Sequence, residues 1–354
     1  VPKGTFIATG VRVEKAGILN LEQGSALCFK GGETLYVYGK VNLLGTEEEP
    51  AVFTADGNAS WSGIHIYEGG SLKGEHAKIR KIACVHRSNY TYAGILSCGT
   101  LELTNCEVEA SGQSGSTIVS ADSGSTRITG GTIQGANCAI YVCQKGDGSF
   151  ILTETLIEGA IYDGVSVYSV GSGTFAITGN RFERNGGYPL VINLEGLYTG
   201  NEMESITDNS FSENVKVNGI VLSGNAKKEV NLPTGEFFFH MVRINAGGVL
   251  NIEKGSTICA DDWAIEVSGT LNVRGTEEEP VIFTALGDET YGTNLMGEES
   301  TTWKGIFVIG GGVLKGEHAK ILNTSGYGWV NGYRFAVYVQ GTAELRACEV
   351  NSGG

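Results

Sequence analysis

Acidic residues that a sheet would bring together are the first feature of this 354-residue sequence that suggests a reaction. A glycosidase works with two carboxyl groups that lie about 5 to 9.5 Å apart. Adjacent strands of a sheet lie roughly 4.8 Å apart, so equivalent positions on them can supply such a pair. The candidate pairs are Asp163 with Glu158, Glu183 with Asp208, and Asp261 with Asp262. The alternative is that all six are solvated turn residues, a role for which Asp is conformationally suited.

Two arginines suit the other common reaction on polysaccharides, which is β-elimination. A lyase needs a base and a group, such as Ca²⁺ or Arg, that neutralises the uronate carboxylate. Arg181 and Arg184 in the segment GNRFERN are the best basic candidates, and Arg184 directly follows Glu183. Ion pairing at the surface explains both arginines equally well.

The sequence gives less support for metal binding or nucleophilic catalysis. The five histidines and eight cysteines show no CxxC pair, no metal-ligand spacing and no Ser-His-Asp order. His76 and His318 stand at equivalent places in two copies of LKGEHAKI, which favours a structural role. Several cysteines replace Val, Ile or Ala of neighbouring repeats, so we interpret them as small buried side chains and expect no structural disulfides. We predict no metal and no cofactor.

Aromatic residues in loops suggest recognition instead of catalysis. Aromatic faces bury a large area at little entropic cost and suit sugar rings or partner proteins. The alternative role of the same side chains is to cover the flank of the fold. The candidate ligand-binding residues are Tyr327, Trp329 and Tyr333 in NTSGYGWVNGYR, Tyr198 in the bulge 195–203, and Tyr90 and Tyr92.

Internal repeats show which elements must position these residues. Val1–Gly57 and Leu232–Gly287 are similar along their length and share the block GTEEEP. We therefore predict a single domain, 1–354, with an internal duplication. It consists of a complete copy, 1–231, and a partial second copy, 232–354, and we expect it to be a fragment of a longer array.

A shorter period runs inside the long copy. Leu103, Ile128, Leu152, Ile177 and Ile206 are each followed by Thr and are separated by 25, 24, 25 and 29 residues. A coil of about 24 residues fits three short strands and three bends. In such a coil each strand pairs with its counterpart one coil away, and alternate side chains stack in a narrow core. We predict an all-β parallel β-helix, a solenoid of roughly fourteen coils, with these five residues buried as one column.

The bends between strands need left-handed backbone angles, which Gly and Asn adopt most easily. We assign this role to bend residues that include Gly179, Asn180, Asn185, Asn209 and Asn214. No segment shows a helical period with caps, so helices are not expected.

The runs GTEEEPVIFTA, WKGI, GNRFERNGGYPLVIN and TDNSFSENVKVNGIVLSGN resemble the right-handed parallel β-helix repeats of bacterial surface and secreted proteins, within the pectin-lyase-like fold group. The resemblance covers essentially the whole chain. It implies a right-handed parallel β-helix and a secreted or cell-surface location in a bacterium. Its functional meaning is open, because that fold group carries polysaccharide lyases, glycoside hydrolases, pectin esterases, adhesins and phage tailspikes.

Charge limits the partners. The 25 Lys and Arg against 39 Asp and Glu give a formal charge of −14, which disfavours nucleic acid and anionic membranes. No run approaches the ~18 apolar residues that cross a bilayer, so no membrane insertion is expected.

The two copies agree best in strands and bends rather than in polar clusters, which favours a structural or adhesive role. We predict a noncatalytic surface or secreted module whose loops recognise a glycan or a host or cell-surface protein. The alternative is a carbohydrate-active enzyme, a glycoside hydrolase or polysaccharide lyase, with acidic residues on one flank.

Overall fold

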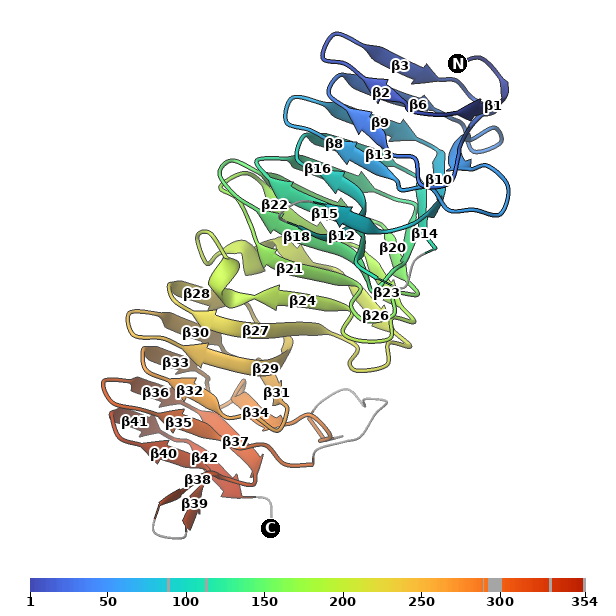
Figure 1. Cartoon of the computed structure of the whole chain (residues 1–354). Helices are drawn as coiled ribbons and strands as arrows, with labels where there is room; N and C mark the ends of the chain where they lie inside the picture. Colours follow the sequence, from blue (N-terminus) through green and yellow to red (C-terminus); the bar gives the residue numbers. More distant parts are fainter. Residues whose placement is uncertain (88–89, 112–113, 289, 292–300, 331–332, 353–354) are drawn as a thin grey trace. The chain divides into compact units, whose positions relative to one another are not determined.

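The computed structural model of the chain consists almost entirely of β-strands (Figure 1). It describes residues 1–87, 90–111, 114–288, 290–291, 301–330 and 333–352, and the side chains of 87, 90–91, 327–330, 333–334 and 352 are outside this description. The described residues form a parallel β-solenoid of about 13 turns with roughly 25 residues per turn, which confirms the predicted fold class. Two compact units divide the chain, Val1–Pro189 with Ile206–Asn214 and Leu190–Ser205 with Val215–Gly354.

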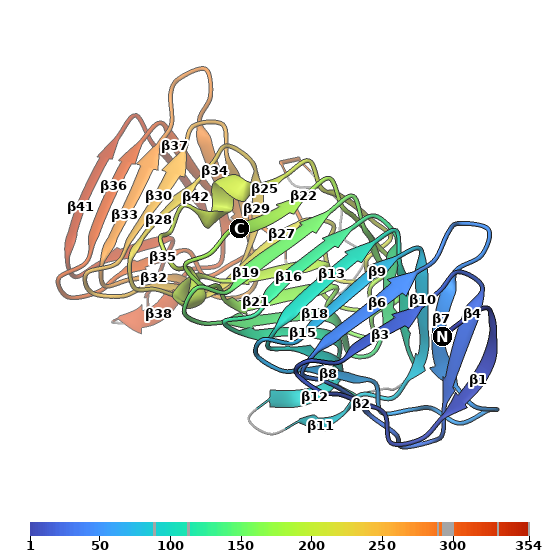
Figure 2. The same cartoon turned by 90° about the horizontal axis from the view of Figure 1, so that it is seen from above.

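Three series of parallel strands form the first unit. Sheet A consists of β1 (Gly4–Ala8), β4 (Ser25–Phe29), β7 (Ala51–Ala55), β10 (Ala77–Ile82), β14 (Glu107–Ala110), β17 (Thr132–Gly135), β20 (Leu156–Glu158), β23 (Arg181–Glu183) and β26 (Ser210–Ser212). Sheet C consists of β3 (Ile18–Leu21), β6 (Lys40–Leu44), β9 (Ser71–Glu75), β13 (Thr100–Thr104), β16 (Ser125–Thr129), β19 (Ser149–Thr153), β22 (Phe175–Thr178) and β25 (Ile206–Thr207), which lie side by side in Figure 2.

The third series of the first unit is sheet B. It consists of β2 (Arg12–Val13), β5 (Leu35–Val37), β8 (Ile64–Ile66), β12 (Tyr90–Ser97), β15 (Ser116–Asp122), β18 (Cys138–Gln144) and β21 (Val165–Ser169). The short strand β11 (Val85–Arg87) pairs with β12 in the antiparallel sense.

Side chains at equivalent positions stack inside the first unit. Register pairing joins Leu103, Ile128, Leu152, Ile177 and Ile206 in one column on sheet C. None of the five is more than 7% exposed. The predicted internal column is therefore confirmed.

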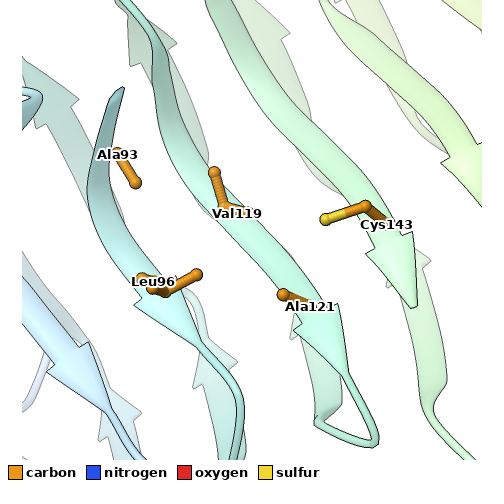
Figure 3. Packing of buried hydrophobic residues seen from close by; sticks show 5 residues of the cluster. All are labelled: Ala93, Leu96, Val119, Ala121 and Cys143. Carbon is orange, nitrogen blue, oxygen red and sulfur yellow. The ribbon is translucent and has the colours of Figure 1, made fainter. Parts of the chain in front are cut away.

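An apolar cluster also lies where three strands of sheet B run side by side. Figure 3 shows its members, which are Ala93, Leu96, Val119, Ala121 and Cys143. Neighbours along a strand point to opposite faces, so Val119 lies on the other face of β15 from Ile118. Leu96 is 1% and Val119 0% exposed, so this part of the sheet is buried on both faces.

Asparagines lie at the bends, but their backbone angles are not the left-handed ones that were predicted from the sequence. The left-handed residue is the one before each asparagine, namely Gly179, Arg184, Asp208 and Glu213, with φ of 69°, 53°, 58° and 55°. Asn180 donates from Nδ2 to Asn209 Oδ1 at 3.0 Å, and Asn185 donates to Asn214 Oδ1 at 2.9 Å. The assignment of left-handed angles to these four asparagines was wrong, because their amides instead hydrogen-bond from one turn to the next.

The second unit has a five-stranded sheet and two further series of strands. Sheet D consists of β28 (Glu229–Leu232), β30 (Val249–Glu253), β33 (Thr270–Arg274), β36 (Val313–Glu317) and β41 (Thr342–Arg346). The strands β24 (Leu190–Asn193) and β27 (Ile220–Ala226) lead to the long strand β29 (Glu236–Ile244), which pairs with both β31 and β32.

Two series continue from β29. One consists of β31 (Thr257–Ala260), β34 (Val281–Ala285), β37 (Ala319–Thr324) and β42 (Glu349–Ser352). The other consists of β32 (Ile265–Val267), β35 (Ile306–Val308) and β40 (Val337–Val339). The remaining elements are the antiparallel pair β38 (Tyr327–Val330) and β39 (Tyr333–Phe335) and the 3₁₀ turns η1 (Leu194–Gly196) and η2 (Glu202–Ser205).

The two copies of the repeat fold alike where their core residues agree. Trp61 and Trp303 are both 0% exposed, and their indole N–H groups donate to main-chain carbonyls at 2.9 and 2.8 Å. His76 and His318 have φ of 45° and 46°. The two histidines therefore occupy equivalent left-handed bends in the two copies. The boundaries of the duplication, 1–231 and 232–354, stay a prediction.

Candidate functional site

The outer face of sheet A gathers polar side chains from successive turns. Because side chains alternate along a strand, the buried Ile79 and Val108 face the core and their neighbours face outward. One outward column consists of Lys78, Glu107, Thr132, Leu156, Arg181 and Ser210. The next consists of Glu109, Gln134, Glu158, Glu183 and Ser212.

A groove of about 520 Å³ lies beside the first column, and we call it the sheet A groove. Its lining is Thr46, Glu47, Pro50, His76, Ala77, Lys78, Asn105, Glu107, Gly131 and Thr132. Most of these residues offer a hydroxyl, amide, imidazole or charged group. The groove is therefore suited to a polar ligand and not to an apolar one.

Left-handed bends hold one wall of the groove. His76 and Asn105 have φ of 45° and 51°. The backbone N–H of His76 donates to the Thr104 carbonyl at 3.0 Å, and that of Asn105 donates to the Thr129 carbonyl at 2.8 Å. These bonds run from turn to turn and fix the backbone from which both side chains project.

One of the two carboxylates in the groove, that of Glu107, is paired with cations. Lys78 Nζ lies 2.8 Å from Glu107 Oε1, and Arg80 also donates to Glu107. Burial alone raises the pKa of Glu107, but the hydrogen bonds and charges of Lys78 and Arg80 outweigh burial and lower the pKa below its ordinary value. Glu107 is therefore a carboxylate at neutral pH and has no proton to give.

Four of the eight residues proposed for catalysis, two acidic and two basic, meet farther along this face. Arg184 binds Glu158, and its Nη1 lies 3.1 Å from Glu183 Oε2 and 3.7 Å from Glu213 Oε2. Arg181 Nε lies 3.2 Å from Glu183 Oε1. Glu158 and Glu183 are register partners on adjacent strands, with side chains 21% and 23% exposed. The two carboxylates are thus held together by one guanidinium group.

This ion pairing decides what the face can do. A glycosidase that protonates its leaving group needs one carboxyl group with a raised pKa. Glu158 and Glu183 are instead both engaged by the guanidinium group of Arg184. No family model, curated protein or solved structure matches this chain. The geometry of the chain itself is therefore the basis for a functional proposal.

The other acidic candidates lie elsewhere. Asp163 accepts a hydrogen bond from the backbone N–H of Tyr188 at 3.2 Å, and Asp208 is exposed at its left-handed bend. Asp261 and Asp262 belong to the second unit, where Asp261 lies against His240 and Asp262 against Lys304. No group of three His, Cys, Asp or Glu among the described residues is arranged to hold a metal ion.

Two of the six aromatic candidates have described side chains. Tyr92 is 47% exposed and contacts His86 edge to face at 5.6 Å between ring centroids. Tyr198 is 50% exposed, and Lys228 Nζ lies 5.5 Å from its ring centroid. The side chains of Tyr90, Tyr327, Trp329 and Tyr333 lie outside the described residues, although their backbones belong to β12, β38 and β39.

Sequence reasoning missed an aromatic stack on sheet B. Tyr67 lies between Tyr38 and His65, with ring centroids 4.1 and 3.9 Å away, and Arg12 lies 4.4 Å above Tyr38. The signal was present in LYVY and IHIY, because aromatic residues two apart on a strand share a face. Neighbours cover both faces of Tyr67, so this stack stabilises the sheet and offers no open platform there.

In the described part of the chain, no helix has the length and hydropathy to span a bilayer.

Proposed function

We propose that the protein is a noncatalytic β-solenoid module that binds a glycan in the sheet A groove. The observation that carries the proposal is the groove itself, a cavity of about 520 Å³ with a polar lining fixed by a parallel sheet. Sugar hydroxyl groups both donate and accept hydrogen bonds, so Thr46, Asn105 and Thr132 are suitable partners. Preorganised partners reduce the entropy that binding costs.

Charge supports an uncharged glycan. Glu47 adds a carboxylate to the groove, in which Lys78 is already paired with Glu107, and the chain carries a formal charge of −14. Both disfavour a polyanionic ligand such as a uronate polymer. Because Glu107 is a charged, ion-paired carboxylate, it is also better suited to binding than to acid catalysis.

The proposal includes a secreted or cell-surface location in a bacterium and a structural or adhesive role, as the resemblance of the repeats implies. A host or cell-surface protein is the competing partner class. Screening the full chain against an array of glycans separates the two, because the account expects saturable binding to an uncharged oligosaccharide.

The groove is tested by removing its hydrogen-bonding groups. Asn105→Gly keeps the left-handed bend, and Thr132→Ala removes a hydroxyl group that points outward from β17. The double variant should weaken glycan binding by about tenfold, since each lost hydrogen bond is worth roughly 0.5–1.5 kcal/mol. Ser125→Ala, an exposed change on sheet C, is the matched control and should bind like the parent. Equal affinity of the double variant and the parent would exclude the groove.

A carbohydrate-active enzyme is the second candidate, either a glycoside hydrolase or a polysaccharide lyase. The observation in its favour is the register pairing of Glu158 with Glu183, on strands about 4.8 Å apart. That spacing approaches the carboxyl separation of a retaining glycosidase, about 5–5.5 Å. Release of reducing ends or of an unsaturated product from a polysaccharide, abolished in Glu183→Gln, would replace the leading proposal with this one.

A further inference from the structure

We propose that the second unit carries a separate saccharide site, the Trp263 corner, formed by His240, Asp261, Asp262, Trp263 and Lys304. It goes beyond the sheet A groove, because it uses other residues in the other compact unit. Its ligand is an uncharged sugar ring that stacks on the indole of Trp263.

Hydrogen bonds and ion pairs fix this corner. The strand β31 ends at Ala260, and Asp261 Oδ1 accepts the backbone N–H of Trp263 at 3.2 Å. Asp261 Oδ2 lies 2.5 Å from His240 Nδ1. Asp262 Oδ1 lies 2.9 Å from Lys304 Nζ. The turn that carries Trp263 is therefore held from both sides.

A bulge in β29 directly follows His240. The register of β29 against β27 pairs Ser223 with His240 and then Gly224 with Val242, so Met241 is the extra residue. Met241 has φ of 55°, a left-handed angle that costs free energy in any residue with a Cβ atom. Bulges of this kind redirect side chains.

Trp263 is exposed although it is large and apolar. Its exposed fraction is 48%, whereas Trp61 and Trp303 are 0% exposed. The turn that carries this indole also holds two carboxylate groups, which are paired with an imidazole and an ammonium group. An apolar surface and hydrogen-bonding groups are thus found on the same turn. A sugar ring has the complementary surface, with C–H groups on its face and hydroxyl groups at its edge.

The first copy of the repeat builds the same corner without an aromatic residue. Its loop 30–33, Lys-Gly-Gly-Glu, is one residue longer than Asp261–Trp263, and Thr9 and Ser62 stand at the positions of His240 and Lys304. There Ser62 Oγ donates to the Gly32 carbonyl at 3.0 Å, and Glu33 Oε2 accepts the backbone N–H of Gly10 at 2.9 Å. An acidic residue thus also braces the corner of the first copy, whereas the fold does not require an aromatic one. The exposed indole of the second copy therefore indicates a binding site there.

The charges at the corner select the ligand class. Asp262 is 67% exposed but paired with Lys304, and Asp261 is engaged by His240, so no charge of either sign dominates. A polyanion is disfavoured by the formal charge of −14 of the whole chain. An apolar peptide would bury four ionisable side chains at high cost. An uncharged saccharide avoids both penalties.

The test measures affinity by calorimetry with the full chain and three probes of equal length, which are a cello-oligosaccharide, a chitosan oligosaccharide and an oligogalacturonate. The cello-oligosaccharide should bind, and Trp263→Ala should weaken that binding by at least about tenfold. Trp263→Phe should retain part of it. Tyr168→Ala removes an equally exposed ring, 56%, in the first unit and is the matched control.

The proposal for the groove and the proposal for the corner can be contradicted independently. Binding at the corner should survive the double change Asn105→Gly and Thr132→Ala, whereas binding in the groove should survive Trp263→Ala. The corner proposal is overturned if Trp263→Ala leaves affinity for the cello-oligosaccharide unchanged. It is also overturned if only the amine-bearing or the uronate probe binds, or if none of the three does.

Discussion

At the scale of single residues, backbone conformation explains several positions that first suggested catalysis. Arg184 and Asp208 were candidates because of their charge. Both occupy left-handed bends, and each directly precedes an asparagine that hydrogen-bonds to the equivalent asparagine of an adjacent turn. Glu154 occupies the equivalent bend with φ of 53°. The residue type at such a bend is thus free to vary, provided that the left-handed angle is tolerated.

Substitution of Asp208 separates the two roles. Asp208→Val should destabilise the protein by about 1–2 kcal/mol, because a β-branched residue resists a left-handed angle, whereas Asp208→Gly should be neutral or stabilising. Thermal unfolding followed by circular dichroism measures both. If Gly and Val destabilise equally, the carboxylate and not the bend is what the position requires.

The ion pairing of Glu107 predicts how the stability of the folded protein depends on pH. Its pKa in the folded protein lies below the ordinary value of 4.5, because Lys78 and Arg80 stabilise the charged form. A carboxyl group with a depressed folded pKa contributes stability that is present above 4.5 and is lost as pH falls through the folded pKa. The parent should therefore lose more stability on acidification than Glu107→Gln does. Urea unfolding at a series of pH values checks this, and parallel curves for the two proteins would contradict it.

At the scale of elements, register decides which residues meet. The sequence showed a step of 25 residues between Leu103 and Ile128, and the same step separates Glu158 from Glu183. The proposed pair of Glu183 with Asp208 applied this step, but the turn between them is 29 residues long, so Ser212 and not Asp208 lies beside Glu183. The inner columns were predictable because their period is regular and their residues are uniformly apolar.

The Trp263 corner was less accessible to prediction. His240 and Asp261 are 21 residues apart, which is the step that pairs β29 with β31, since Phe239 lies beside Ala260. The period of 24 or 25 residues in the long copy could not place this pair, because the turn here is shorter. The available signal was Trp263 in a loop whose counterpart in the first copy, 30–33, has no aromatic residue.

The strands of sheet B also protect thiols. Burial raises the pKa of Cys98 and Cys143 to about 12, with nearby Asp122 as a further cause. Because the thiolate is the reactive form, alkylation near pH 8 should be slower than in the unfolded chain by on the order of a hundredfold or more. Mass spectrometry after brief iodoacetamide treatment measures this, with the half-buried Cys348 as the internal comparison. Alkylation of Cys98 and Cys143 as fast as in urea would show that sheet B opens readily.

At the scale of the whole molecule, the account is that a regular parallel solenoid supplies rigidity while its outward residues supply recognition. All eight cysteines are free, so stacking of turns and not cross-linking supports this framework. The formal charge of −14 directs recognition away from polyanions. The two proposed copies share buried residues such as Trp61 and Trp303 and differ in exposed residues such as Trp263.

The most direct test is a titration of the full chain with the uncharged oligosaccharide selected on the glycan array, followed by mass analysis of the recovered sugar. The account predicts saturable heat of binding, its loss in the Asn105→Gly and Thr132→Ala double variant if the array ligand binds in the groove, and a recovered sugar of unchanged mass. Cleavage of the sugar, or binding that neither the groove variant nor Trp263→Ala weakens, would contradict it.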